Sequence, residues 1–306
     1  MIHEITLERR TLHGHFSRDL RPILTIDSGD TIAFPCLDAG WHVAPGQYFE
    51  PRDERLDAGH ALIGPIEVRG ARKGHTLAVR IDAVRVGDFG FTVAGGWSSW
   101  LNDALGLGED AEKQLVRWSL DADAGVGRDE HGREVDLDPF LGVLGMPPDE
   151  AGVHATGPPR PCGGNIDCKE LGPGATLFLP VPVDGARFSA GDGHGRQGDG
   201  ELSGTAIECP VARAELTLTV RDDLPLDWPV ARLPDAWVTF GFGADLDAAT
   251  AIAVDGMLNL LGREHGFERA QALAFASVVV DVRITQVVNG VVGVHAVLPD
   301  GAIRMA

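Results

Sequence analysis

The residues best suited to chemistry gather in the stretch 161–210. Five of the ten positions from Gly191 to Gly200 are glycine, and Asp192, His194 and Glu201 lie among them or follow them directly. Because glycine adopts backbone conformations that other residues avoid, such a segment can turn tightly and aim several side chains at one point. The composition of this loop therefore predicts a binding or catalytic site.

Two pairs of polar residues in this stretch share one spacing. Asn165 and Asp167 stand two positions apart, as do Asp192 and His194, and such residues lie on one face of an extended segment. Carboxylates converging with an imidazole suit a divalent cation, with Zn²⁺ favoured by the histidine and Ca²⁺ or Mg²⁺ favoured by the oxygens. A glycine-rich turn with solvated acids and a hydrogen-bonded histidine is the other interpretation.

The charge balance excludes several classes of partner. The 306 residues include 45 acidic and 26 basic side chains, which gives a formal charge of −19 and a pI near 4.8. We expect no nucleic-acid partner, because phosphate contacts need clustered lysine and arginine. We expect no membrane contact, since no stretch approaches the ~20 apolar residues that cross a bilayer. The first residues, Met1–Glu4, lack the features of a signal peptide, which favours a cytoplasmic location.

Short alternating segments separated by turns indicate a β-rich protein. Strands are expected on both sides of the turn Asp27–Asp30 and again at 64–70, 76–86, 175–180 and 213–220. Acids followed by apolar residues predict a helix over 109–118. A longer apolar pattern, ending before Gly266, predicts a helix over 247–265, followed by a second from Glu268 to about Ala276. A strand at 278–285 and an Asn-Gly turn at 289–290 should complete the chain.

These elements predict a mainly β fold, with β-sandwich-like sheets and a smaller α/β portion at the C-terminal end. The expected parts are an N-terminal β-rich half at 1–120, an irregular excursion or lid at 121–160, a central β-rich segment carrying the site at 161–234, and the α/β portion at 235–306.

Several longer motifs together resemble the acetamidase/formamidase family. They follow the family's order from about residue 20 to residue 298, whereas the stretch 97–150 matches poorly. The motifs are TIDSGD at 25–30, Gly59-His60 with Gly64-Pro65-Ile66, GGNID at 163–167, LFLPV at 177–181, GDGHGRQGDGE at 191–201, GTAIE at 204–208, and VRITQVVNG at 282–290 with GVHA at 293–296.

The resemblance implies a β-rich enzyme that hydrolyses small amides such as formamide and acetamide to a carboxylic acid and ammonia. Some members of the family bind a divalent metal. Carried over position by position, the implied site consists of His60, Asn165, Asp167, Asp192, His194 and Glu201.

Amide hydrolysis needs a strong nucleophile, stabilisation of the oxyanion and a proton for the departing nitrogen. A cation held by Asp167, Asp192 and His194 would supply the first two, with Zn²⁺ the leading candidate and Ca²⁺ or Mg²⁺ the alternatives. Glu201 is the expected general base and later acid, because that role needs a carboxylate close to the water.

The remaining implied residues would bind and position the substrate. Asn165 would bind the amide or complete the metal shell, and His60 would make the site a junction between the two β-rich halves. Trp97 and Trp100 suit the apolar wall of a narrow cavity. Apolar strands and the helix at 247–265 leave surface for self-association, so a homodimer is expected.

Two other functions fit the same sequence. The four cysteines, Cys36, Cys162, Cys168 and Cys209, are too few and too dispersed for a disulfide framework. One of them could instead be the nucleophile of a cysteine amidase, with Cys162 beside two glycines or Cys168 within Cys168-Lys169-Glu170 as candidates. The second alternative is a Ca²⁺-stabilised β-sandwich that binds a ligand without catalysis.

Overall fold

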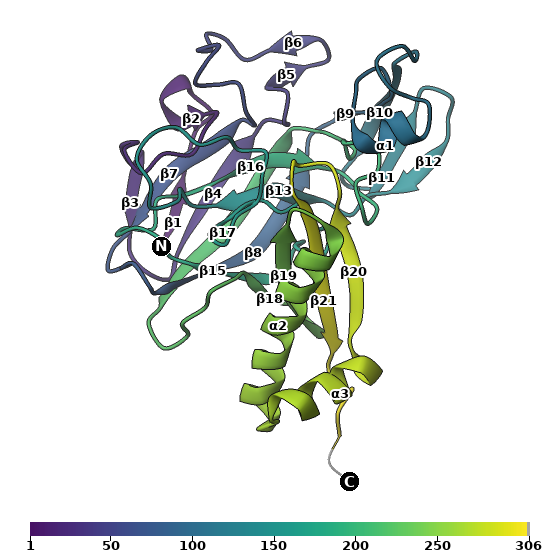
Figure 1. Cartoon of the computed structure of the whole chain (residues 1–306). Helices are drawn as coiled ribbons and strands as arrows, with labels where there is room; N and C mark the ends of the chain where they lie inside the picture. Colours follow the sequence, from purple (N-terminus) through teal and green to yellow (C-terminus); the bar gives the residue numbers. More distant parts are fainter. Residues whose placement is uncertain (305–306) are drawn as a thin grey trace.

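Two β-sheets stacked face to face form the main body of the protein in the computed structural model, which describes residues 1–304 (Figure 1). The larger sheet has nine strands in the order β1-β4-β17-β8-β15-β18-β19-β21-β20. Their bounds are β1 Ile2–Glu4, β4 Asp30–Cys36, β8 Thr76–Val86, β15 Thr176–Pro180, β17 Val211–Arg221, β18 Val230–Arg232, β19 Ala236–Gly243, β20 Asp281–Gln286 and β21 Val292–Pro299.

The second sheet has six strands and carries much of the site. Five strands follow the order β14-β13-β16-β7-β2, and β3 pairs with β7 in parallel. Their bounds are β2 Leu12–His13, β3 Leu24–Ile26, β7 Leu62–Val68, β13 Phe140–Gly145, β14 Gly163–Asn165 and β16 Phe188–His194.

The main hydrophobic core lies between these two sheets. Val79 and Leu218 of the larger sheet and Ile63 and Leu144 of the second belong to one cluster of buried apolar side chains. Strand β17 alternates between buried and less buried positions, as expected of a strand with one face on the core. Such packing of two sheets defines a β-sandwich, and the expected fold class is confirmed.

A smaller antiparallel sheet extends from the sandwich beside the site (Figure 1). It has the order β12-β11-β10-β9, and the short helix α1 (Trp100–Ala104) lies between two of its strands in the chain. A two-stranded hairpin, β5-β6, and a single 3-10 turn complete the N-terminal half. The bounds are β5 His42–Ala44, β6 Gln47–Tyr48, β9 Phe89–Ala94, β10 Gln114–Asp121, β11 Val126–Asp129, β12 Glu134–Asp136 and 3-10 turn Arg9–Thr11.

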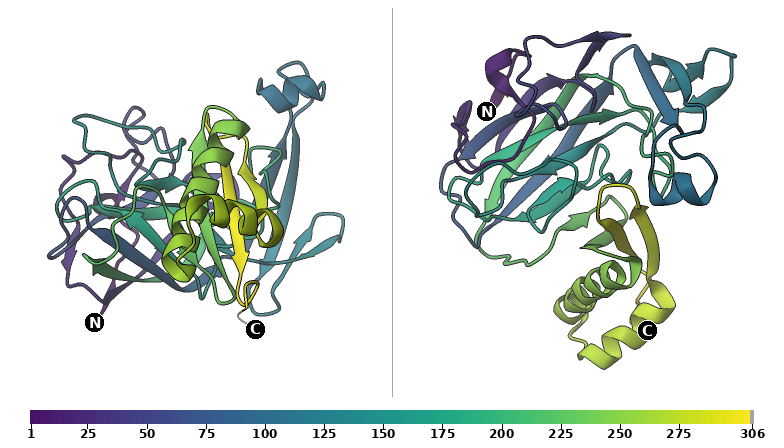
Figure 2. Two further views of the ribbon diagram at one scale, coloured as in Figure 1. Left: turned by 60° about the horizontal axis from the view of Figure 1, so that its bottom comes forward. Right: turned by 45° about the horizontal axis from the view of Figure 1, so that its top comes forward.

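The C-terminal portion is α/β, as expected. Helix α2 (Leu246–His265) packs on β19 and β21, and α3 (Arg269–Val279) leads into β20. The Asp245 carboxylate caps α2 by accepting a hydrogen bond from the Ala248 backbone at 2.8 Å, and Gly266 ends the helix with a φ of 69°. Figure 1 and the right view of Figure 2 show the two helices together at one end of the molecule. In the described part of the chain, no helix has the length and apolar character needed to cross a bilayer.

Three expectations differ from the structure. The strand expected from residue 278 begins only at Asp281, because helix α3 continues to Val279. The helix predicted over 109–118 is wrong, because residues from Gln114 onward form strand β10, which pairs with β9. The acids at 109–112 lie in turns before that strand and do not begin a helix. The segment 121–160, expected to be irregular, contains β11, β12 and β13. All six residues of β13 are buried, so this strand lacks the polar alternation that reveals a half-exposed strand.

Candidate active site

A cavity of about 350 Å³ opens beside the second sheet and the tip of the β20–β21 hairpin. Phe91, Val93 and Trp97, from β9 and the segment after it, provide apolar lining, and Lys113 approaches from the start of β10. The polar lining includes His60, Asn165, Asp192, His194, Glu201, Thr205, Glu208 and Asn289. Strongly polar residues on one side and aromatic residues on the other suit a small polar substrate.

Strands β14 and β16 position the centre of this polar lining. Asp192 and His194 both lie on β16, which pairs with β13, while Asn165 ends β14 and Asp167 follows two residues later. The side chains of Asp167, Asp192 and His194 are 98–99% buried. These side chains lie close together, although the positive φ values of Asp167 and Asp192, 51° and 64°, depart from the extended backbone that the two-residue spacings imply.

Gly142 on β13 makes this convergence sterically allowed. A Cβ at this position would lie 2.5 Å from Asp167 Oδ1, 2.5 Å from Asp192 Oδ2 and 3.0 Å from His194 Cε1. All three side chains therefore reach over the backbone of β13 into space that any other residue would fill. No feature of the sequence around Gly142 identifies this role.

His194 has carboxylates near both ring nitrogens. Its Nε2 lies 3.4 Å from Asp192 Oδ1 and 3.4 Å from Glu208 Oε1, and its Nδ1 lies 4.0 Å from Asp167 Oδ1. Burial alone would lower the pKa of His194, but the negative charges of Glu208 and Asp192 raise it well above its ordinary value. The imidazole is thus set among groups that favour a positive charge.

Burial acts in the opposite direction on two carboxyl groups. It raises the pKa of Asp167 to about 7, with a further contribution from the negative charge of Asp192. Burial and the charge of Asp167 raise the pKa of Glu201 well above its ordinary value. Two crowded acids with raised pKa values are typical of a site that handles protons or binds a cation.

The site contains an unusual number of buried polar atoms without a hydrogen-bond partner. Buried polar groups in folded proteins are nearly always paired, so such a concentration is typical of a site that binds a ligand. Two sets, Asp167 with His194 and Glu201, and Asp192 with His194 and Glu208, have ligand atoms within 4.8 Å of one another. The unpartnered atoms are Asn165 Oδ1, Asp167 Oδ1, Asp192 Oδ1, His194 Nδ1, Glu201 Oε2 and Glu208 Oε2.

His60 reaches the site from the first half of the chain. Its backbone N–H donates to Thr156 Oγ1 at 2.9 Å, and the same hydroxyl lies 2.7 Å from the ring Nδ1. The other ring nitrogen, Nε2, lies 3.8 Å from Asp192 Oδ2. Thr156 therefore fixes the ring so that Nε2 faces the carboxylate cluster.

Glu208 and Asn289 line the cavity but were not predicted as site residues. Glu208 lies in the GTAIE motif, and its Oε1 accepts a hydrogen bond from the Ala206 backbone at 2.9 Å. Asn289 belongs to the turn predicted for the β20–β21 hairpin, and its amide donates to Asp167 Oδ2. The sequence pattern identified Asn289 only as a turn residue, so its contact with Asp167 was not predicted. Of the two tryptophans expected in the wall, Trp97 lines the cavity, whereas Trp100 is 60% exposed.

The cysteines do not support a thiol nucleophile. All four are free and buried, and none lines the cavity. Burial raises the pKa of Cys162 to about 11, and its thiol donates to the Met146 carbonyl oxygen. Burial also raises the pKa of Cys168, whose thiol donates to Glu170. A nucleophilic thiol needs the opposite shift and access to the substrate.

A small cavity with buried carboxylates and imidazoles on one side is typical of an enzyme that acts on a small molecule. Comparison with known proteins identifies its family. The model of the Acetamidase/Formamidase family matches residues 3–155 and 149–300, so the chain belongs to this family.

Individual relatives agree with this assignment. A putative formamidase of Schizosaccharomyces pombe is 28% identical over 303 residues, covering 78% of this chain and 74% of its own. The crystal structure of an acetamidase from Bacillus halodurans has a TM-score of 0.84 and 26% identity, covering 96% of this chain and 97% of its own. An acetamidase from Yersinia enterocolitica has a TM-score of 0.85 and 25% identity, with coverages of 99% and 94%. The protein is an amide C–N hydrolase.

Proposed function

We propose that the protein hydrolyses a short linear amide, of the formamide or acetamide type, to a carboxylate and ammonia with the help of a divalent cation. The observation that carries this proposal is the set of unpartnered buried atoms on Asp167, Asp192, His194 and Glu201 beside a small cavity. The names of the relatives, formamidase and acetamidase, support the same substrate class.

The donor set fits a cation. Asp167, Asp192 and His194 are the proposed ligands, because their carboxylate and imidazole groups converge around the position that a Gly142 side chain would occupy. Zn²⁺ is the proposed ion, because the set includes an imidazole. Ca²⁺ and Mg²⁺ are the alternatives, because the set contains more oxygen donors than nitrogen donors. When bound, such an ion supplies Lewis-acid polarisation of the amide carbonyl and acidification of water.

The chain's own residues bind the substrate and move the protons. Glu201 accepts a proton from the attacking water and passes it to the departing nitrogen, a role that its raised pKa favours. Asn165 lines the cavity, and its unpartnered Oδ1 is the proposed acceptor of a hydrogen bond from the substrate amide N–H. His60 Nε2 and Glu208 flank Asp192 and His194 and hold their orientation.

Ammonia release from formamide and acetamide tests this function directly. We expect release by the purified protein, loss of release after prolonged treatment with a chelator, and recovery when Zn²⁺ is restored. A thiol alkylator should leave the rate unchanged, because no cysteine lines the cavity. Ammonia release that persists after complete removal of metal would contradict the proposed role of the cation. Absence of ammonia release from every short amide would contradict the proposed substrate class.

We further propose that two copies pair through β20. This strand ends the nine-stranded sheet, and Gly200 makes backbone hydrogen bonds to its outer edge at Thr285 and Val287. Val282 and Ile284 on this strand are 49% and 41% exposed. Antiparallel pairing about Val282 would place Asp281 of one copy opposite Arg283 of the other, which favours a second copy as the occupant.

Val282→Lys is expected to convert a dimer into a monomer, because it brings two positive charges together at the centre of the pairing. Sedimentation measurements on the wild type and the variant test this. Val153→Lys is the matched control, since Val153 is 55% exposed and adjoins the bridge between His154 and Phe16, outside β20. A wild-type monomer, or a variant that remains dimeric, would contradict pairing through this edge.

A further inference from the structure

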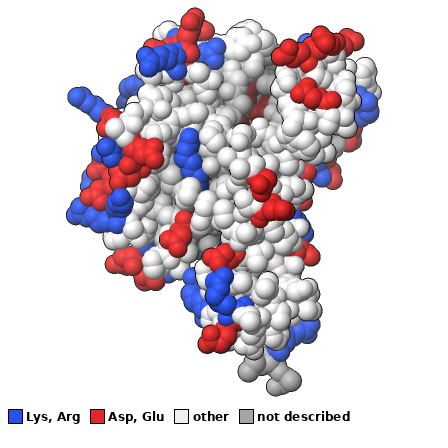
Figure 3. All heavy atoms as spheres, in the orientation of Figure 1, with Lys and Arg blue, Asp and Glu red and all other residues white. Residues whose placement is uncertain are grey.

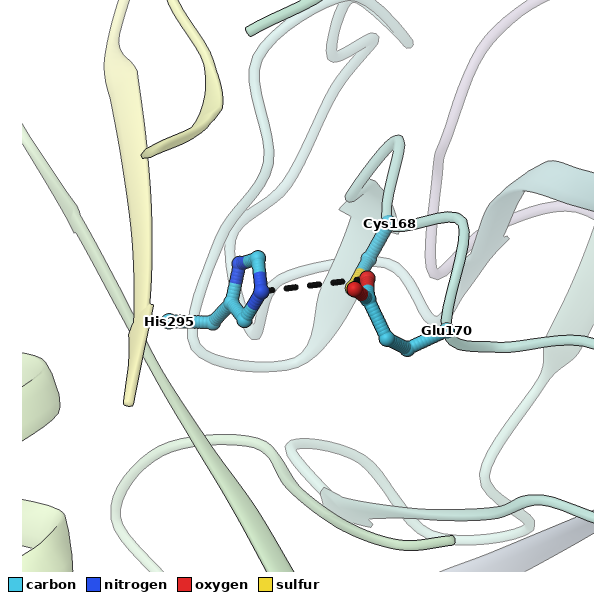
Figure 4. A group of neighbouring side chains, drawn as sticks. All are labelled: Cys168, Glu170 and His295. Carbon is cyan, nitrogen blue, oxygen red and sulfur yellow. Dashed lines mark hydrogen bonds and ion pairs between the residues drawn. The ribbon is translucent and has the colours of Figure 1, made fainter. Parts of the chain in front are cut away.

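A second group of metal-ligating side chains lies outside the cavity. Cys168 and Glu170 belong to the loop after β14, and His295 lies on β21 of the larger sheet. Figure 4 shows the three side chains pointing toward one another, with the dashed line marking the contact between His295 and Glu170. None of the three lines the cavity of the candidate active site.

The distances within this group are those of a compact ligand set. Cys168 Sγ lies 3.1 Å from Glu170 Oε2, and His295 Nε2 lies 3.7 Å from the same oxygen. Bond lengths of about 2.3 Å to sulfur and about 2.0–2.1 Å to nitrogen and oxygen in a tetrahedral zinc site place ligand atoms about 3.3–3.6 Å apart. The distance from Sγ to Oε2 is slightly shorter than that range, and the distance from Nε2 to Oε2 is slightly longer. Small movements of the side chains would therefore let them bind one ion.

Each polar ligand is held by an outer partner. Thr285 Oγ1 lies 2.8 Å from His295 Nδ1, which leaves Nε2 directed at the group. Arg283 donates to Glu170 Oε1 at 3.2 Å, so the other oxygen, Oε2, faces the thiol and the imidazole. A ligand histidine fixed through its second nitrogen, and a ligand carboxylate hydrogen-bonded through its second oxygen, are usual in metal sites.

The buried ring of His295 indicates that a ligand binds between these side chains. His295 is fully buried, and its Nε2 has no hydrogen-bond partner. An orphaned buried nitrogen of this kind is costly unless something occupies the space in front of it. Cys168, 1% exposed, and Glu170, with a side chain 13% exposed, surround that space.

We propose that Cys168, Glu170 and His295 bind a divalent transition-metal ion, with Zn²⁺ as the natural occupant, at a site separate from the active site. Thiolate, carboxylate and imidazole together favour Zn²⁺ over Ca²⁺ or Mg²⁺, which prefer oxygen alone. Binding replaces the thiol hydrogen of Cys168 by the metal, and the proton leaves to solvent.

The ion would join two parts of the fold. Cys168 directly follows Asp167, and His295 belongs to the sheet on which α2 packs. A bond through the metal would therefore fix the loop that carries Asp167 against β21. The proposal is independent of the proposed function, because it concerns residues that do not contact the cavity.

Cobalt binding followed by absorption tests this site. The ligands proposed for the active site include no thiol, so a thiolate-to-cobalt charge-transfer band in the near ultraviolet reports Cys168 specifically. We expect the band when Co²⁺ is added to the metal-free wild type, and its loss in Cys168→Ser together with one equivalent of bound cobalt. Cys162→Ser is the matched control and should keep the band, because this buried thiol donates to the Met146 carbonyl oxygen and belongs to neither group of candidate metal ligands.

A milder variant keeps the test informative if Cys168→Ser fails to fold. Thr285→Val keeps the size of the side chain but removes the hydroxyl at His295 Nδ1. It should keep the band while weakening cobalt binding by about 10- to 100-fold, as loss of an outer partner does at other metal sites. A wild type without the band, a band unchanged in Cys168→Ser, or unaltered affinity in Thr285→Val would each overturn the proposal. Ammonia release plays no part in these measurements.

Discussion

Glu201→Gln is expected to lower turnover of a short amide by about 10²- to 10⁴-fold, the range that general acid–base catalysis contributes. The substitution keeps the shape of the side chain but removes its ability to accept a proton. Glu201 is 6% exposed, and its Oε2 lacks a partner, so little else in the structure should change. Ammonia release at saturating amide and metal analysis of the same sample measure the two effects.

The metal content of this variant separates two roles for Glu201. If Glu201 is the general base, the variant keeps its bound cation, whereas Asp192→Ala loses both the cation and activity. Loss of the cation in Glu201→Gln would instead make Glu201 a ligand, in keeping with its closeness to Asp167 and His194. Full activity in the variant would remove it from the proton-transfer role altogether.

Gly142→Ala should remove the cation and lower turnover by about 10²-fold or more, although the change adds a single methyl group. The new Cβ would lie 2.5 Å from both Asp167 Oδ1 and Asp192 Oδ2, a separation at which the neighbouring atoms must move. The backbone itself accepts alanine here, since Gly142 lacks a left-handed φ. Metal analysis and ammonia release on the folded variant measure the result.

Gly157→Ala is the control for this experiment. Gly157 also lacks a left-handed φ, and an added Cβ there meets nothing within 4 Å. This variant should keep its cation and its rate. Near-normal metal content and activity in Gly142→Ala would show that Asp167 and Asp192 do not need their present positions to act together.

The sequence predicted the sandwich and the C-terminal helices because local patterns specify them. Strand β17 alternates in burial along its length, and α2 has both a capping carboxylate and a terminal glycine. Strand β10 was misread because the acids before it imitate the first turn of a helix. Its identity as a strand depends on pairing with β9, which a local pattern does not contain.

The site could be predicted only in part, for a similar reason. Asn165, Asp167, Asp192 and His194 stand in two close pairs, so the sequence pointed to the right segments, but their convergence also depends on Gly142 and on the left-handed backbone at Asp167 and Asp192. Glu208 reaches the cavity from a segment that forms isolated β-bridges outside the named strands, and Asn289 reaches it from the β20–β21 hairpin. Their roles arise from tertiary packing. The surface was predictable from composition: Figure 3 shows basic side chains scattered among acidic ones on the face that it presents.

Asp167, Asp192 and Glu201 have φ values of 51°, 64° and 48°, in the left-handed region. Such a conformation costs a residue other than glycine about 1–3 kcal/mol, so the surrounding sheets must supply that energy at three positions of the site. Replacing any of these acids by glycine would relieve the backbone strain but remove a proposed metal ligand or the proposed general base. Stability and activity therefore favour different residues at these three positions. Selection for higher stability alone would favour inactive variants.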